Sequence, residues 1–163
     1  MIIIGGPTNS GKTGLAIEIA KIVDAEVISA DSRQIYKNMD VGTGKIPIGS
    51  NVKIVKNKTY WIVDGVKVWG FDLINPDEIY SAADFFNYYS KVRKNIESRG
   101  KEVILAGGTG FYIDTVLRNG VSSTVKVNHT LRQKLNKLTA GELLARLPSA
   151  VAQTLNPSER QTN

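Results

Sequence analysis

A run of glycine, lysine and threonine near the start of the chain, residues 6–13, has the composition of a phosphate site. Its sequence, Gly-Pro-Thr-Asn-Ser-Gly-Lys-Thr, matches the pattern G-x-x-x-x-G-K-[ST] without departure. Glycines let successive backbone N–H groups point at phosphate oxygens, and a following helix adds the positive end of its dipole. Lys12 would place a charge at the terminal phosphate, and the Thr13 hydroxyl would hold Mg²⁺ or touch a phosphate. The predicted di- or triphosphate site comprises Gly6, Pro7, Thr8, Asn9, Ser10, Gly11, Lys12 and Thr13.

Two further polar clusters follow apolar runs that are typical of strands. Asp31 follows the run 26–30, and Thr109 follows the run 103–106 in the turn Gly-Gly-Thr. In an open parallel sheet, ligands bind beyond the carboxyl ends of the strands, so these clusters should share one edge with residues 6–13. Asp31 could be a Mg²⁺ ligand, a general base or the cap of the next turn, and spacing does not separate the first two.

The elements that must position these residues open in the order strand, loop, helix, strand. Residues 1–5 read as a buried strand, and 11–23 as a helix. The apolar stripe of this helix is Leu15, Ile19, Ile22 and Val23, with Ala16 and Ala20 beside it. With the strand 26–30 they form a βαβ unit, which implies a parallel sheet with a right-handed crossover. A helix over 81–99, opened by a Ser81–Asp84 capping box, precedes the strand 103–106.

Residues 51–71 have a different character, because they are β-branched and aromatic. Asp64-Gly65 between apolar runs is a strong hairpin signal. We predict a small antiparallel meander of three short strands, inserted into the α/β unit and packed by Trp61 and Trp69. Beyond it, helices are expected near 111–117, near 128–137 and from a Thr139–Glu142 capping box, where Pro148 interrupts. The predicted fold class is α/β: a P-loop NTPase-like parallel sheet flanked by helices, with the inserted meander and a helical C-terminal part.

Composition limits the remaining possibilities. At 163 residues and 17.8 kDa the chain suits one domain, and the lack of cysteine excludes disulfides, thiolate zinc sites and iron–sulfur clusters. The start is too short an apolar run for a signal peptide, and no stretch is long enough to span a membrane, so we expect a cytoplasmic protein. The net charge is +6, of which residues 101–163 contribute +4. A polyanion such as nucleic acid would explain this excess, and so would ordinary solubility charge.

Several ordered blocks resemble the tRNA dimethylallyltransferase family, which prenylates the adenosine 3′ to the anticodon. The blocks are residues 6–13, 29–45, 71–76, 80–85 and 107–113. The resemblance implies that residues 6–13 hold the diphosphate of dimethylallyl diphosphate with Mg²⁺, and that the partner is the anticodon stem–loop of tRNA. It implies catalytic roles for Asp31 as general base and for Lys12 and Thr13 at the diphosphate. The tRNA contacts it implies are Asp31, Ser32, Arg33, Gln34, Thr109 and Arg132.

The main departure from the family is length. The chain covers about half of a typical member and has no counterpart of the later catalytic arginine. We therefore expect one P-loop domain over 1–163, a monomer, in which 128–163 begins a truncated helical tRNA-binding region. A small ATP-dependent kinase, a prenyltransferase acting on free adenine nucleotide, and an inactive truncated remnant stay open as alternatives.

Overall fold

The computed structural model describes residues 1–45, 52–120 and 128–156. By its contacts the chain forms two compact units, Met1–Ser122 and Ser123–Asn163. The first unit contains the sheet and the loops that follow its strands. The second contains the helical segment that the sequence predicts from residue 128 onward.

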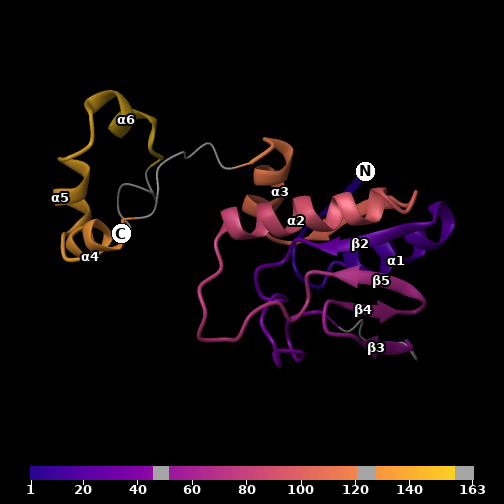
Figure 1. Ribbon diagram of the computed structural model, residues 1–163. Helices are drawn as coiled ribbons and strands as arrows, with labels where there is room; N and C mark the ends of the chain where they lie inside the picture. Colours follow the sequence, from indigo (N-terminus) through magenta and orange to yellow (C-terminus); the bar gives the residue numbers. More distant parts are fainter. Residues whose placement is uncertain (46–51, 121–127, 157–163) are drawn as a thin grey trace. The chain divides into compact units, whose positions relative to one another are not determined.

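A sheet of six strands forms the centre of the first unit (Figure 1), in the order β1-β6-β2-β5-β4-β3. The four strands β1, β6, β2 and β5 run parallel, and β4 and β3 continue the sheet antiparallel. This confirms the α/β class and the parallel βαβ opening. The bounds in sheet order are β1 (Ile2–Gly5), β6 (Glu102–Gly107), β2 (Ala25–Ser29), β5 (Val66–Trp69), β4 (Tyr60–Val63) and β3 (Ile54–Lys56).

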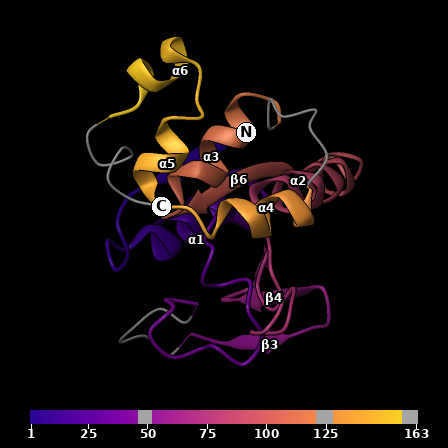
Figure 2. The ribbon, with the colours of Figure 1, turned by 90° about the vertical axis from the view of Figure 1, so that its left-hand side faces the viewer.

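The predicted three-strand antiparallel meander is confirmed as β3, β4 and β5. Strand β5 also pairs in parallel with β2, with Val27 opposite Val68, so the meander extends the main sheet. Figure 2 shows β4 and β3 at one end of the sheet, away from β6. Joining the sheet lets β4 bury Trp61 and Val63 under the same helix that covers the parallel strands. The predicted Asp64-Gly65 hairpin is confirmed, with both residues at positive φ as a two-residue turn requires.

Helices cover both faces of the sheet. Helix α1 (Lys12–Val23) packs on one face, and α2 (Ala82–Glu97) with α3 (Gly110–Leu117) on the other. The predicted stripe of α1 is wrong in part. Ile19 packs against the core as predicted, whereas Leu15, Ile22 and Val23 are exposed. The buried face is formed by Ala16, Ile17 and Ala20, because small residues let the helix lie close to the sheet.

The capping predictions are confirmed in both units. Ser81 and Asp84 form a capping box at the start of α2, and Thr139 and Glu142 form one at the start of α5. Pro148 follows the end of α5 and stands at the N-cap of α6. The helices of the second unit are α4 (His129–Leu135), α5 (Ala140–Leu144) and α6 (Ser149–Thr154).

Candidate active site

The predicted clusters meet at the carboxyl edge of the parallel strands. Gly5 at the end of β1 pairs with Gly107 at the end of β6, and Ser29 at the end of β2 pairs with Ala106. The glycine-rich loop (residues 6–13), the segment after β2 and the turn 107–109 therefore leave the sheet side by side. Strand order alone brings these three chain segments together.

A cavity of about 420 Å³, here called the edge cavity, opens at this place. On one side its lining is the glycine-rich loop from Thr8 onward, and on the other it is the segment after β2. The lining residues are Thr8, Asn9, Ser10, Gly11, Lys12, Thr13, Gly14, Asp31, Gln34, Thr43, Gly44, Ala106 and Gly107. The remaining predicted phosphate residues, Gly6 and Pro7, line a neighbouring cavity of about 390 Å³.

The glycine-rich loop presents backbone groups to the edge cavity. Gly11, at the N-cap of α1, has φ of 80°, and Asn9 has φ of 62°, a conformation that asparagine adopts more readily than most residues. No side chain described in the structure caps α1, so the first N–H groups of the helix are available to an anion. The Lys12 ammonium curls back to donate to the Pro7 carbonyl. This wall can hold a diphosphate.

Asp31 faces the same cavity and also closes a turn. The residue is only 9% exposed, and its Oδ1 accepts a hydrogen bond from the backbone N–H of Arg33 at 3.0 Å. Its Oδ2 lies on the side of Gly108, where a Cβ would stand 3.5 Å from that oxygen and 3.9 Å from the Lys12 Nζ. The capping role weighed for Asp31 is therefore present. The second oxygen remains directed to the Lys12 side, where a base or an Mg²⁺ ligand would act.

The turn after β6 is fastened to the segment that carries Asp31. A Cβ on Gly107 would lie 2.1 Å from the Ala30 carbonyl oxygen, so only glycine fits there. The Thr109 hydroxyl accepts from the Ser32 N–H at 2.8 Å and donates to the Ser32 hydroxyl at 3.1 Å. Thr109 is predicted to contact tRNA, but both hydrogen bonds of its hydroxyl go to Ser32 and position it.

The other predicted tRNA contacts differ in exposure. Arg33 is exposed and Ser32 half-buried, whereas Gln34 is buried. The Gln34 Oε1 accepts from the Ser29 hydroxyl at 2.6 Å, and its Nε2 donates to the Thr43 carbonyl at 2.9 Å. Arg132 is exposed on α4 in the second unit. The structure therefore brings Asp31, Ser32, Gln34 and Thr109 together with the glycine-rich loop, and holds Arg132 in a separate unit.

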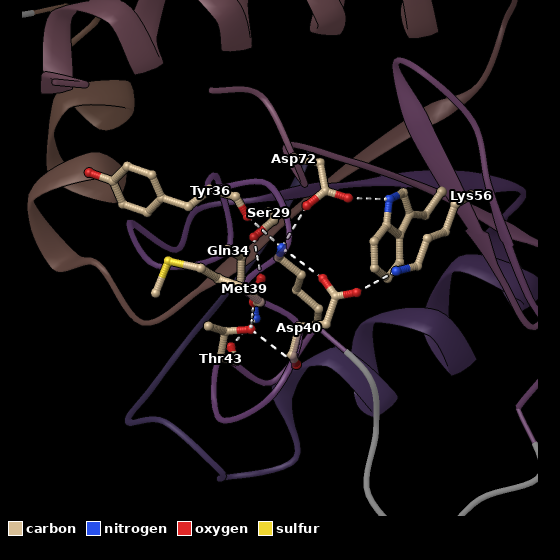
Figure 3. Close-up of polar contacts among 10 residues, drawn as sticks. Ser29, Gln34, Tyr36, Met39, Asp40, Thr43, Lys56 and Asp72 are labelled. Atoms are coloured by element: carbon tan, nitrogen blue, oxygen red, sulfur yellow. Dashed lines mark hydrogen bonds and ion pairs between the residues drawn. The ribbon is translucent and has the colours of Figure 1, made fainter. Parts of the chain in front are cut away.

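Sequence reasoning missed a buried ionic cluster beside this site (Figure 3). Lys45, which is fully buried, donates to the Tyr36 carbonyl and to the carboxylates of Asp40 and Asp72. Hydrogen bonds from Lys56, with a smaller contribution from Lys45, hold the pKa of Asp40 below its usual value against partial burial. Except for Lys56, these residues lie in the blocks 29–45 and 71–76, yet a single lysine produces no periodicity from which burial could be predicted.

Oxygen donors at the edge cavity suit a hard cation. The Thr13 hydroxyl and the Asp31 carboxylate both line it, which is the ligand type that Mg²⁺ prefers. Among the described residues there is no cluster of three or more histidine or acidic side chains, so a cation here would depend on substrate oxygens. Within the same residues, no helix has the length and apolar character to cross a membrane.

A comparison with protein-family models matches residues 34–162 to IPP transferase. The chain belongs to this family. The matches to curated proteins cover 99% of the chain and therefore include the glycine-rich loop as well. The tRNA dimethylallyltransferase of Staphylococcus haemolyticus is 37% identical over 99% of this chain and 48% of its own length. That of Staphylococcus aureus strain bovine RF122 / ET3-1 is 34% identical over 99% and 51%. The chain thus spans about half the length of the curated relatives it matches.

Solved structures give the same family. The full-length tRNA isopentenylpyrophosphate transferase of Bacillus halodurans superposes with a TM-score of 0.64 at 30% identity, covering 98% of this chain and 51% of that one. A eukaryotic dimethylallyltransferase acting on tRNA superposes with a TM-score of 0.73 at 25% identity, covering 98% and 38%. The predicted resemblance is confirmed by both kinds of comparison.

Proposed function

We propose that this chain carries the active-site part of an enzyme that prenylates tRNA. The group transferred is dimethylallyl, the donor is dimethylallyl diphosphate, and the acceptor is N6 of the adenosine 3′ to the anticodon. The observation that supports this best is the position of Asp31 across one cavity from the glycine-rich loop. The family supplies the reaction class, since its curated relatives are named tRNA dimethylallyltransferase.

The glycine-rich loop would bind the donor through its diphosphate. The first N–H groups of α1 and the Lys12 ammonium, released from Pro7, would contact the phosphate oxygens. When the bond between C1 of the dimethylallyl group and the diphosphate oxygen breaks, its electron pair goes to the diphosphate. The backbone N–H donors at the start of α1 are already fixed in place, so they stabilise the developing charge without reorganisation.

Asp31 would act on the acceptor. As the adenine N6 forms its bond to C1, it must lose a proton, and the Asp31 Oδ2 on the Lys12 side can accept it. A positioned general base contributes typically ~10²–10⁴-fold in rate. The hydrogen bond from Arg33 to Oδ1 fixes the carboxylate so that its other oxygen keeps this direction.

Two further components complete the proposal. Thr13 would hold Mg²⁺ together with the diphosphate, and when bound the ion would neutralise charge on the leaving group. The target adenine must leave its stack at a cost of a few kcal/mol. Exposed Arg33, beside the cavity, could stack on or bond to the RNA. Arg132 lies in a unit whose described part carries four basic residues and one acidic residue, which favours RNA backbone contact.

The test is transfer of labelled dimethylallyl diphosphate to tRNA, to an anticodon stem–loop and to AMP by the 163-residue chain. We expect label on the two RNAs, and a loss of at least ~10²-fold for Asp31→Ala. Label on AMP alone would indicate a prenyltransferase for free nucleotides, and ATP turnover without prenyl transfer would indicate a kinase. Diphosphate binding without any transfer would indicate an inactive remnant and contradict the proposed activity of this chain.

A further inference from the structure

Lys45 is the most deeply buried charged side chain of the described chain, with 0% exposure. Its ammonium lies 2.6 Å from the Tyr36 carbonyl oxygen, 2.6 Å from the Asp72 Oδ1 and 3.1 Å from the Asp40 Oδ1. These three acceptors match the three N–H donors of an ammonium. A buried charge is strongly unfavourable unless it is paired and hydrogen-bonded, so the loss of any one of these contacts would leave the ammonium incompletely compensated.

The partners of Lys45 come from two segments that leave neighbouring strands. Tyr36 and Asp40 follow β2, whereas Asp72 follows β5. Asp72 has φ of 55°, a strained conformation for a residue other than glycine, and its Oδ2 accepts from the Trp61 indole at 3.0 Å. Figure 3 shows the Asp72 and Asp40 carboxylates on two sides of the cluster, with Lys56 beyond Asp40. The ammonium therefore joins the segment after β2 to the sheet through β4.

Lys45 also ends the stretch that forms one wall of the edge cavity. This stretch, residues 34–45, is here called the second wall, and its members Gln34, Thr43 and Gly44 line the cavity. Thr43 is two residues before Lys45, and its hydroxyl donates to the Met39 carbonyl at 2.7 Å. The residues described as lining the cavity do not include Lys45 itself. Its ammonium can influence a ligand only through the chain that it holds.

We propose that Lys45 is a positioning residue, which fixes the second wall against the glycine-rich loop through Asp72, Asp40 and the Tyr36 carbonyl. The two lysines of the region then have separate tasks: Lys12 contacts the ligand, and Lys45 sets the width of the cavity into which the ligand fits. This inference rests on the proposed function, because it assigns a diphosphate to the edge cavity. It predicts that removing a charge outside the cavity weakens binding inside it.

The test measures the affinity of the full 163-residue chain for inorganic pyrophosphate by titration calorimetry, so no RNA and no transfer are needed. Lys45→Met keeps the length of the side chain and removes its charge. We expect the Kd of this variant to rise on the order of 10-fold, since small misplacements of a site have effects of this size or larger. Asp40→Asn, at a partner that is partly exposed, should fold normally and raise the Kd about 3-fold.

A matched control separates positioning from general destabilisation. Glu26 is another buried charge, paired with Arg99 at 2.5 Å and 2.7 Å near the opposite end of β2. Glu26→Gln should lower the melting temperature and leave the pyrophosphate Kd unchanged. If Lys45 acts through Asp72, the double variant Lys45→Met/Asp72→Asn should bind no more weakly than Lys45→Met alone.

The inference is overturned if Lys45→Met, or Asp40→Asn where Lys45→Met does not fold, keeps the Kd within about two-fold of wild type. It is also overturned if Glu26→Gln weakens binding as much as Lys45→Met does. A wild-type chain that binds no pyrophosphate would instead overturn the proposed function. The two failures are therefore distinguished by which protein, wild type or variant, gives the unexpected result.

Discussion

The two walls of the edge cavity are built on different principles. The glycine-rich loop is exposed, uses backbone N–H groups, and owes its shape to positive φ angles at Asn9 and Gly11. The second wall is held from inside by side chains: Gln34 bonds to Ser29 and Thr43, and Lys45 bonds to Asp40 and Asp72. One wall is shaped by local conformation, and the other by contacts between segments far apart in the sequence.

This difference has consequences for both stability and binding. An exposed loop with few internal contacts can adjust to a ligand at little cost to the fold. A buried polar network behaves in the opposite way, because removing one member leaves its partners without hydrogen bonds. We therefore expect substitutions in the glycine-rich loop to change ligand binding, and substitutions in the second wall to change stability and binding together.

The largest loss of stability should come from a substitution at Gly107, in the turn that packs against the backbone leading into the segment after β2. In Gly107→Ala the new Cβ would collide with the Ala30 backbone, so Ala30 and the adjoining Asp31 would have to shift. We expect a loss of about 3 kcal/mol or more in the free energy of unfolding, measured by urea denaturation. Gly110→Ala is the control, since no described atom lies within 4 Å of its Cβ. Equal stability of the two variants would contradict the close approach at Gly107.

A smaller loss of stability should distinguish the two walls, when one substitution in each wall is compared. Gln34→Leu removes partners from the Ser29 hydroxyl and the Thr43 carbonyl, and should lower the free energy of unfolding by about 1–3 kcal/mol. Ser10→Ala in the glycine-rich loop should change it by less than about 0.5 kcal/mol. Urea denaturation of both variants checks this. A stability loss for Ser10→Ala as large as for Gln34→Leu would show that the walls do not differ as described.

The smallest expected effect concerns acid stability. The pKa of Asp40 in the second wall is held below its usual value by Lys56 and Lys45. A lowered pKa in the folded state stabilises the protein above the unfolded pKa of about 3.8, and this contribution is lost as the pH falls further. Melting temperatures between pH 6 and pH 3 should thus fall less steeply for Asp40→Asn than for wild type. If the melting temperatures of the two proteins fell in parallel with pH, Asp40 would make no contribution to the loss of stability in acid.

The glycine-rich loop was predictable from the sequence because its chemistry is local. Pattern, preceding strand and following helix all lie within 23 residues, and the structure has each of them. The meeting of Asp31 and Thr109 with that loop was also predictable, since the carboxyl ends of parallel strands share an edge. The capping boxes at Ser81 and Thr139 follow from short-range hydrogen bonds and were found for the same reason.

The second wall was not predictable, because its partners are set by the tertiary fold. Nothing near Lys45 in the sequence indicates that Asp72 and Trp61 will surround it, and a lysine is usually an exposed residue. The face of α1 was mistaken for a related reason. Periodicity placed Leu15 and Ile22 at the centre of the buried face, whereas the close approach of helix and sheet centres that face on Ala16, Ile17 and Ala20.

The central claim is that the glycine-rich loop binds the diphosphate while Asp31 acts on the other substrate. Titration of dimethylallyl diphosphate into wild type, Lys12→Ala and Asp31→Ala tests it most directly. The account predicts a Kd about 10–100-fold higher for Lys12→Ala, from the loss of one charge-assisted contact, and a Kd for Asp31→Ala within about 3-fold of wild type. Equal losses for both variants would make Asp31 part of the diphosphate site and contradict its role as the base.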